Sequence, residues 1–196
     1  MMIEIAEAPI ASIADIARIP IAFTVDRVLD IGERDGAFVL TERILDAPWV
    51  KDYDVISGEG PAALAARFDL SRWGLIVAHT DGSLVGGAVI AFDTRGVDML
   101  RGQRDLAVLW DLRVAPELRG RGVGAALFRA SEAWAAARGC TALEVETQNV
   151  NAAACRFYAR MGCALASIDR HAYPALPQEI QMIWRKELPP TTGSDG

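Results

Sequence analysis

Apolar residues in the second half of the chain recur at the spacing of a helix face. The intervals are four, three, four and three, and the residues are Val123, Leu127, Ala130, Trp134 and Ala137. Side chains spaced in this way lie on one side of an α-helix. The pattern predicts a helix over residues 122–138, which Gly139 ends as a C-terminal cap. A second helix is predicted over residues 151–161, closed by Gly162.

Elsewhere, alternating or short continuous apolar runs predict strands, and turn-forming residues separate them. Asp81-Gly82 supplies a hairpin turn. A short helix is expected over residues 62–68, and residues 47–54 are expected to form a loop. The predicted strands span residues 21–31, 36–45, 73–80, 83–93, 106–114, 141–147, 163–168 and 179–187.

The order of these elements predicts one mixed domain of the α/β (α+β) class. Strands dominate the first half, and strand–helix–strand–helix–strand–strand follows. The 196 residues are 52% hydrophobic and 23% charged, which is sufficient for a single core. We expect the domain to span residues 1–188, and the polar, Pro- and Gly-rich residues 189–196 to form a flexible tail.

Charge and cysteine content narrow the class of protein. The formal net charge is -6, and no basic cluster marks a nucleic-acid-binding surface. The three cysteines form no CxxC pair, which argues against a disulfide framework or a zinc site. No apolar run approaches the about 20 residues that span a membrane, and the N-terminus lacks the basic start of a signal peptide. We therefore expect a cytoplasmic protein with reduced thiols, no metal, and no nucleic-acid or membrane partner.

A glycine-rich segment lies between the strand at 106–114 and the helix at 122–138. Its sequence is Arg119-Gly120-Arg121-Gly122-Val123-Gly124. Unpaired N–H groups at a helix N-terminus bind anions, glycines let a ligand approach the backbone, and arginines add charge-assisted contacts. The combination predicts a pyrophosphate-binding loop, and the alternative is a turn with two solvated arginines. The Lys-Ser or Lys-Thr of a Walker loop is absent from the sequence, and the connector after Val114 is too long for a dinucleotide fingerprint.

Two motifs resemble those of the GNAT superfamily of N-acetyltransferases. The pattern R/Q-x-x-G-x-G/A of its cofactor loop is filled by Arg119, Gly122 and Gly124. The second motif is matched by Asn151, Phe157, Tyr158 and Gly162. The resemblance covers roughly residues 83–168 and implies a single GNAT-type domain. It also implies acetyl-CoA as co-substrate and a mixed, mostly antiparallel sheet whose strands splay at the cofactor cleft.

The same resemblance implies roles for individual residues. The backbone of Leu112, Arg113 and Val114 is expected to pair with the pantetheine arm of the cofactor. Asn151 and Ala154 are expected to lie against the cofactor. The pyrophosphate is expected at Arg119, Gly120, Arg121, Gly122, Val123, Gly124 and Ala125. Tyr158 is expected to contact the cofactor near its sulfur and to act as general acid towards the departing thiolate.

Amine acetylation needs groups that move protons. A neutral amine attacks the thioester carbonyl, a base or a water chain takes its proton, and the thiolate leaves more readily when it is protonated. A tyrosine hydroxyl, whose reference pKa is about 10, can donate to the thiolate. The alternative for Tyr158 is an ordinary half-buried helix residue.

A longer segment resembles the streptothricin acetyltransferases within this superfamily. It runs VETQNVNAAACRFYARMGCALASIDRHAYP, and WVKDYD upstream resembles a further segment of that group. Those enzymes acetylate an amine on the β-lysine portion of the antibiotic. Two positions depart from their pattern, because Trp110 replaces an often acidic residue and Cys163 replaces an aromatic one.

A cationic amine requires carboxylates, and aromatic walls favour it further. Asp111 lies inside an apolar strand, and alternation places it on one face with Ala107, Leu109 and Arg113. An acid there is costly unless it is paired or faces a cleft. Asp111 is the first candidate for the base or the amine anchor, and the alternative is a salt bridge to Arg113 or another arginine.

Further acceptor-side candidates come from two other segments. Glu146 shares a strand face with Glu144 and is the second candidate base. A solvated face is the alternative for both, and we favour it for Glu144. A lid over the acceptor is expected from Trp49, Asp52, Tyr53 and Asp54, with a solvated loop as the alternative. Trp110 is also expected to contact the substrate.

The sequence thus predicts an acetyl-CoA-dependent N-acetyltransferase with direct transfer to a primary amine of a small molecule, such as a streptothricin-like antibiotic. Antibiotic resistance is the expected role. A protein N-terminal or lysine acetyltransferase and a non-catalytic acyl-CoA-binding sensor remain alternatives. A homodimer is expected by analogy with relatives.

Overall fold

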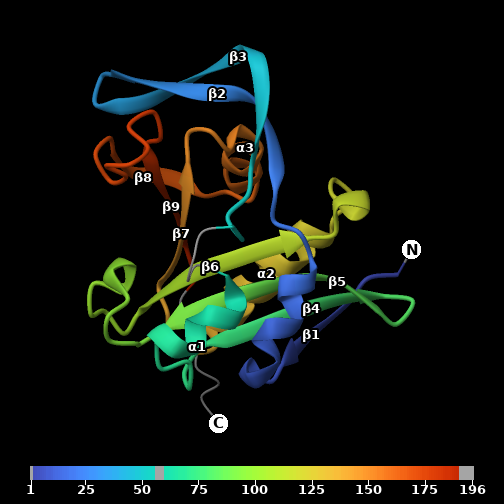
Figure 1. Cartoon of the computed structure of the whole chain (residues 1–196). Helices are drawn as coiled ribbons and strands as arrows, with labels where there is room; N and C mark the ends of the chain where they lie inside the picture. Colours follow the sequence, from blue (N-terminus) through green and yellow to red (C-terminus); the bar gives the residue numbers. More distant parts are fainter. Residues whose placement is uncertain (1, 56–59, 190–196) are drawn as a thin grey trace. The chain divides into compact units, whose positions relative to one another are not determined.

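The computed structural model describes residues 2–55 and 60–189 (Figure 1). They fall into two compact units, each assembled from segments that are distant in the sequence. Of the described residues, the first unit comprises 2–21, 53–55, 60–144 and 187–189, and the second comprises Ala22–Asp52 and Val145–Lys186. The domain boundary at residue 188 stays a prediction, and the expected flexible tail beyond residue 189 lies outside the described residues.

A mixed sheet has the strand order β1-β4-β5-β6-β7-β9-β8. Strand β6 pairs antiparallel with β5, and its parallel register with β7 runs from Leu106↔Ala142 to Val108↔Glu144. The strands are β1 Glu4–Ala8, β4 Gly74–Thr80, β5 Ser83–Phe92, β6 Leu106–Val114, β7 Ala142–Gln148, β8 Ala164–Asp169 and β9 Gln181–Glu187. The sheet confirms the predicted α/β class.

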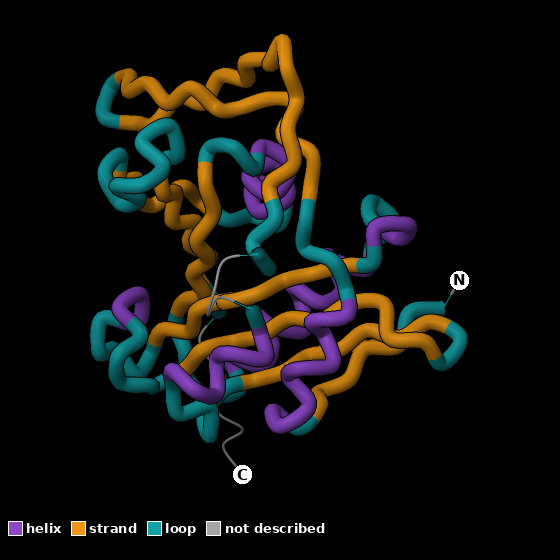
Figure 2. Tube along the Cα trace, in the orientation of Figure 1, coloured by secondary structure: helices purple, strands orange, loops and turns teal. Residues whose placement is uncertain are grey.

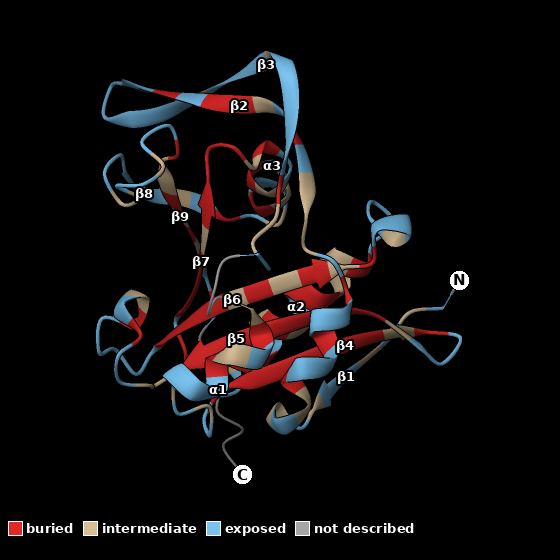
Figure 3. Ribbon diagram, in the orientation of Figure 1, coloured by how far each residue is buried: buried red, intermediate tan, exposed pale blue. Residues whose placement is uncertain are grey.

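Helical segments cover both faces of the sheet in the first unit. On one face, Ile16 and Leu64 pack into a core with apolar residues of β4, β5 and β6, and these strands are almost wholly buried (Figure 3). On the other face, Leu127 and Trp134 lie close to glycines of β5 and β4. The helical segments of the first unit are η1 Ile10–Arg18, η2 Pro61–Ala63, α1 Leu64–Arg67, η3 Asp98–Leu100, η4 Pro116–Leu118 and α2 Val123–Ala136, and the contacts named above come from η1, α1 and α2.

Gly74 at the start of β4 offers a test of this packing. A Cβ there would lie 2.4 Å from Cε2 of Trp134. The indole ring is held in place, because it packs edge-on against Phe92 and its Nε1 donates to Glu7 at 2.8 Å. We expect Gly74→Ala to lower the free energy of unfolding by about 1–3 kcal/mol through overpacking. Thermal unfolding followed by circular dichroism should show a fall of roughly 2–4 °C per kcal/mol.

Gly32 in strand β2 (Phe23–Arg34) is the matched control for that measurement. A Cβ at Gly32 would meet only the Val39 carbonyl, at an ordinary 3.9 Å. We expect Gly32→Ala to leave stability unchanged or slightly raised, since alanine has less backbone freedom in the unfolded chain. Equal losses in both variants would contradict the packing argument.

The second unit contains a long hairpin of β2 and β3 (Ala37–Lys51) and the helix α3 (Ala152–Arg160) (Figure 2). The turn of the hairpin, at Asp35 and Gly36, has positive φ at both residues, as a two-residue type I′ turn requires. At the other end of β3, the buried Lys51 donates to Glu179 at 2.6 and 2.9 Å. This ion pair fixes the end of the hairpin against the segment before β9.

The structure corrects the expected loop at 47–54. Residues 47–51 belong to β3. The register of β3 with β2 shifts between the pairs Arg27↔Ile44 and Val25↔Trp49, so the ladder contains an irregularity there. The irregularity accommodates Pro48, which donates no ladder hydrogen bond. Strand β1 and the 3-10 segment η1 were not predicted. Among the described residues, no helix is long and apolar enough to cross a membrane.

Candidate functional site

The glycine-rich segment forms an exposed loop between β6 and α2 in the first unit. Gly120 has φ +76 and Gly122 has φ +93, a region that glycine adopts without steric cost. A Cβ at either position would meet nothing within 4 Å, so the backbone conformation, and not crowding, requires glycine. No side chain caps the N-terminus of α2. The first-turn N–H groups, which have no intrahelical partner, therefore point out of an open helix end that suits an anion.

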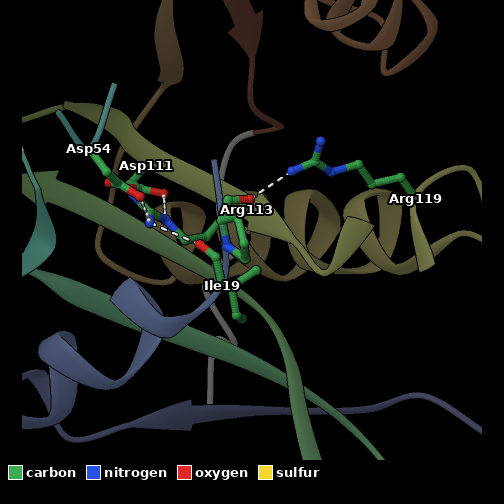
Figure 4. A network of polar contacts seen from close by, with 6 residues as sticks. Ile19, Asp54, Asp111, Arg113 and Arg119 are labelled. Carbon is green, nitrogen blue, oxygen red and sulfur yellow. Dashed lines mark hydrogen bonds and ion pairs between the residues drawn. The ribbon is translucent and has the colours of Figure 1, made fainter. Parts of the chain in front are cut away.

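The side chain of Arg119 binds backbone carbonyls around this loop (Figure 4). Its Nη2 donates to the Pro20 carbonyl at 2.6 Å and its Nε to the Val114 carbonyl at 3.1 Å. Burial lowers the pKa of Arg119, and the charge of Glu117 opposes this effect. These contacts tie the loop to the end of β6 and to the segment after η1. Arg121 is exposed, and phosphate contacts of both arginines stay predictions.

A β-bulge in β6 decides where its polar side chains point. Asp111 lies opposite Val89, whereas Leu109 lies opposite Ile90, which leaves Trp110 as an extra residue. An extra residue reverses the alternation of faces along a strand. The prediction that Asp111 shares a face with Ala107 and Leu109 is therefore wrong. Asp111 instead lies on the face of Val89, where the core includes residues of η1 and α1.

Arg113 shares this face, because it lies opposite Gly87 on β5. A Cβ at Gly87 would be 2.4 Å from Cγ2 of Ile16. The absent side chain thus allows η1 to approach the sheet closely. As a result, the carbonyl of Ile19, just after η1, accepts a hydrogen bond from Nη1 of Arg113 at 3.0 Å.

Asp111, Arg113 and Asp54 form one network of charged groups (Figure 4). Arg113 donates from Nε and Nη2 to Asp111 at 2.9 and 2.6 Å. It also donates from Nη1 and Nη2 to the two carboxylate oxygens of Asp54, each at 3.1 Å. Burial raises the pKa of Asp111, and the Arg113 guanidinium opposes this shift. The salt bridge between Asp111 and Arg113, foreseen as the alternative, is present.

The other predicted acceptor-side residues are divided between the two units. Tyr53 and Trp110 belong to the first, and Trp49 and Asp52 to the second. Trp110 joins an aromatic cluster, with ring centroids 5.3 Å from Phe68 and 5.5 Å from Trp73. Of the predicted acceptor-side residues, Asp54 and Asp111 both bind the Arg113 guanidinium, and Trp110 precedes Asp111 in the chain.

In the second unit, Asn151 lies at the start of α3 and Tyr158 in its last turn. Asn151 is the N-cap, and its Oδ1 accepts a hydrogen bond from the backbone N–H of Ala154 at 3.1 Å. Such a cap satisfies one of the unpaired N–H groups of the helix. Tyr158 is 7% exposed, and its ring packs edge-on against Phe157 with centroids 5.3 Å apart. Asn151, Phe157 and Tyr158 therefore cap and pack one helix, and the contacts of Asn151 and Tyr158 with the cofactor stay predictions.

Glu146 lies in a polar cluster that sequence reasoning did not find. Its carboxylate accepts hydrogen bonds from the Tyr173 hydroxyl at 2.5 Å and from Gln181 Nε2 at 2.8 Å. Gln148 Nε2 also donates to the Tyr173 oxygen, at 2.8 Å. Tyr173 and Gln181 are distant from Glu146 in the sequence. Tyr173 lies near the end of the segment that resembles the streptothricin acetyltransferases, but nothing in that segment indicates a contact with Glu146, so only the fold reveals the cluster.

The expectation that Glu144 lies on a solvated face is wrong. Its side chain is buried, not solvated, and accepts hydrogen bonds from Nη1 and Nη2 of Arg101 at 2.9 and 3.0 Å. A bidentate arginine can compensate for the burial of a carboxylate. Arg101 follows η3 with a positive φ of 51, a position that strand periodicity does not indicate.

Two of the three cysteine thiols, those of Cys140 and Cys155, are poorly suited to nucleophilic catalysis. Burial raises the pKa of Cys155, on α3, to about 12 and that of Cys140 to about 11. The thiolate is the reactive form of cysteine, so transfer without an acyl-cysteine is favoured. In the described part of the chain, no three His, Cys, Asp or Glu residues gather as a metal site would require.

Comparison with known proteins gives the site its context. The sequence matches the acetyltransferase (GNAT) family over residues 42–163. It is 30% identical over 167 residues to a streptothricin acetyltransferase of Escherichia coli, with 83% of each chain covered. It is 29% identical over 168 residues to a streptothricin acetyltransferase of Streptomyces lavendulae, which covers 86% of this chain and 85% of that protein. The crystal structure of a nourseothricin acetyltransferase superposes with a TM-score of 0.73 at 27% identity, covering 96% of this chain and all of that one.

The family match includes the glycine-rich loop, the bulged strand β6 and α3 with Tyr158. The two motifs on which the sequence-based expectation rested thus lie inside the matched range. The chain belongs to the acetyltransferase (GNAT) family and is an acetyl-CoA-dependent N-acetyltransferase.

Proposed function

We propose that this enzyme acetylates a primary amine of a streptothricin-like antibiotic and thereby confers resistance to it. The observation that carries the proposal is the extent of the similarity to streptothricin acetyltransferases, which spans 83% or more of the chain. That similarity exceeds the range of the family match, which ends at residue 163. It therefore covers more than the segments that bind the cofactor.

On the cofactor side, the proposal uses the loop, the start of α2 and the end of β6. Backbone N–H groups from Gly120 to Ala125, with the charges of Arg119 and Arg121, would hold the pyrophosphate. The backbone of Leu112–Val114 would pair with the pantetheine arm, since the described register of β6 with β7 ends at Val108. Asn151 and Ala154 at the start of α3 would also contact the cofactor.

The proposed reaction is one direct acyl transfer. The neutral amine nitrogen attacks the thioester carbonyl carbon, a C–N bond forms and the C–S bond breaks. The amine loses a proton to a base, and the departing thiolate receives one from the Tyr158 hydroxyl. Bringing amine and thioester together in one site supplies much of the acceleration.

Glu146 is the proposed base. Its carboxylate is partly exposed and is oriented by Tyr173 and Gln181. Asp111 fits this role less well, because it is buried and its oxygens bind the positively charged Arg113, whereas the donors to Glu146 are neutral. We assign Asp111 to the anchoring of the amine, together with Asp54. Trp49, Asp52, Tyr53 and Trp110 would line the acceptor side.

A thiol-release assay tests the proposal. Purified enzyme and acetyl-CoA are incubated with streptothricin, aminoglycosides, polyamines, amino acids and peptides, and free CoA thiol is measured. We expect streptothricin to have the highest kcat/KM, with mass spectrometry showing one added acetyl group. Turnover of peptides with inert streptothricin would favour a protein acetyltransferase, and acetyl-CoA binding without any turnover would favour a sensor.

We further propose that the enzyme is cytoplasmic and pairs as a homodimer. Three buried cysteine thiols suit a reducing compartment, and acetyl-CoA is available there. Light scattering on the purified chain tests the dimer, and a monomer at micromolar concentration would contradict it.

A further inference from the structure

The guanidinium of Arg113 has an acceptor for every N–H it carries. An arginine side chain offers five donors in a planar fork. In this chain Nε and Nη2 reach Asp111, Nη1 and Nη2 reach Asp54, and Nη1 reaches the Ile19 carbonyl. Three segments therefore meet on one side chain: β6, the residue after η1, and the segment that holds Tyr53 and Asp54.

The members of this network differ in exposure. The side chain of Arg113 is 1% exposed and that of Asp111 is 8% exposed, whereas that of Asp54 is 31% exposed. Of these three side chains, only Asp54 both binds the buried guanidinium and is accessible to solvent. A substrate can reach Asp54, and Asp54 in turn depends on Arg113 for its position.

The geometry of Asp54 suits a contact with a cation. Both of its carboxylate oxygens accept hydrogen bonds from Nη1 and Nη2 of Arg113, each at 3.1 Å. The carboxylate is therefore held in one orientation while its side chain stays 31% exposed. A carboxylate fixed in this way can meet a positively charged ligand without first losing side-chain freedom.

We propose that Arg113 is a positioning residue that fixes Asp54 for recognition of the charged amine, so that the network sets the affinity for cationic acceptors. This inference rests on the proposed function, because it takes a cationic amine as the acceptor. The bulge at Trp110 is what makes it possible, since it turns Asp111 and Arg113 towards Asp54 and η1. The side-chain network acts on the acceptor, whereas the part proposed for Arg113 in cofactor binding belongs to its backbone.

Asp54→Asn and Arg113→Lys test the two ends of the contact. The first substitution keeps the shape of the side chain without its charge, and the second keeps the charge without the fork that serves both carboxylates. We expect each variant to raise KM for the amine about 10-fold, with a smaller change in kcat. Asp54 is not among the residues assigned to the cofactor, so Asp54→Asn should also keep KM for acetyl-CoA within about 2-fold. Asp54→Glu, which retains the charge, should recover part of the loss.

The double variant distinguishes positioning from independent contacts. If Asp54 acts through its bond to Arg113, the double variant should be no worse than the more affected single one, as expected for residues in one network. Additive effects, or kcat losses that equal the KM changes, would overturn the proposal. Arg113 is buried, so thermal unfolding is measured for each variant. Should Arg113→Lys fail to fold, an unchanged amine KM in Asp54→Asn overturns the proposal by itself.

Asp93→Asn is the matched control. Asp93 also pairs with two arginines, Arg72 at 2.5 Å and Arg104 at 3.4 Å, but it lies at the far end of β5 from the pairing of Gly87 with Arg113. We expect its amine KM to stay within about 2-fold of wild type. If Asp93→Asn raised KM for the amine as much as Asp54→Asn does, the effect would come from the loss of any ion pair, and the proposal would be overturned.

The proposed function is tested separately, by measuring binding and turnover of streptothricin with the wild-type enzyme. If streptothricin neither binds in calorimetry nor turns over, the proposed substrate fails, and the variants are measured with whichever cationic amine of the panel is acetylated. A wild-type enzyme that acetylates only uncharged amines, or no amine, would overturn the role of the network as well.

Discussion

Tyr158→Phe is expected to lower kcat by about 100- to 10,000-fold, the usual range for loss of a general acid. The substitution removes only the hydroxyl, and the ring can keep its edge-on contact with Phe157. Because Tyr158 is 7% exposed, the side chain that carries the proposed proton donor is largely shielded from bulk water. Water therefore replaces it poorly as a proton donor. Stopped-flow or steady-state thiol release measures kcat, and calorimetry measures the Kd for acetyl-CoA, which should change less than about 3-fold.

Cys155→Ala on the same helix is the control for this experiment. Cys155 is buried, and burial raises its thiol pKa to about 12, so its role is packing against neighbours such as Met182. We expect a small loss of stability and a kcat within about 2-fold of wild type. A Tyr158→Phe enzyme with normal kcat would show that Tyr158 is a packing residue. A large loss in Cys155→Ala would point to an acyl-cysteine intermediate.

The parts of the fold that the sequence predicted are those with a local cause. Strand β6 was expected at residues 106–114 and spans Leu106–Val114, because a continuous apolar run bounded by turn residues depends little on distant partners. The same holds for α2, which has an apolar face at regular spacing and glycines at both ends. The cofactor loop belongs with them, since its motif is contiguous.

The orientation of Asp111 could not be predicted, because a bulge leaves no signature in single-strand alternation. Trp110 is one of several apolar residues in its run, and nothing in its identity marks it as extra. The insertion is visible only in the register with β5, where Val89 and Ile90 face Asp111 and Leu109. One unpaired residue therefore moved the central carboxylate of the acceptor hypothesis to the opposite face of the sheet.

Long-range ion pairs explain most of what else was missed. Lys51 and Glu179 are separated by 128 residues, and Arg101 and Glu144 by 43. Each acid would be unfavourable in its buried position without the cation, yet the sequence around each acid is that of an ordinary exposed strand or loop. Polar residues whose partners come from distant segments are thus the hardest to assign from periodicity.

Gly122→Ala carries the second large expected effect, on the cofactor. Gly122 has φ +93 at the start of α2, and an alanine there is strained by about 1–2 kcal/mol. Relaxation of that strain would turn the N–H groups of the first helical turn away from the pyrophosphate. We expect KM for acetyl-CoA to rise about 5- to 30-fold, with a smaller change in KM for the amine, because the strain of about 1–2 kcal/mol is the most that binding would have to restore.

Gly82→Ala separates strain from binding. Gly82 lies in the turn between β4 and β5 with φ +75, and a Cβ there also meets nothing within 4 Å. Both variants should therefore lose similar stability in thermal unfolding, since the same backbone penalty applies to each. Only Gly122→Ala should weaken acetyl-CoA, measured as Kd by calorimetry. If the two variants bind acetyl-CoA equally well, the helix N-terminus at Gly122 does not hold the pyrophosphate, and the charges of Arg119 and Arg121 would have to supply the contact.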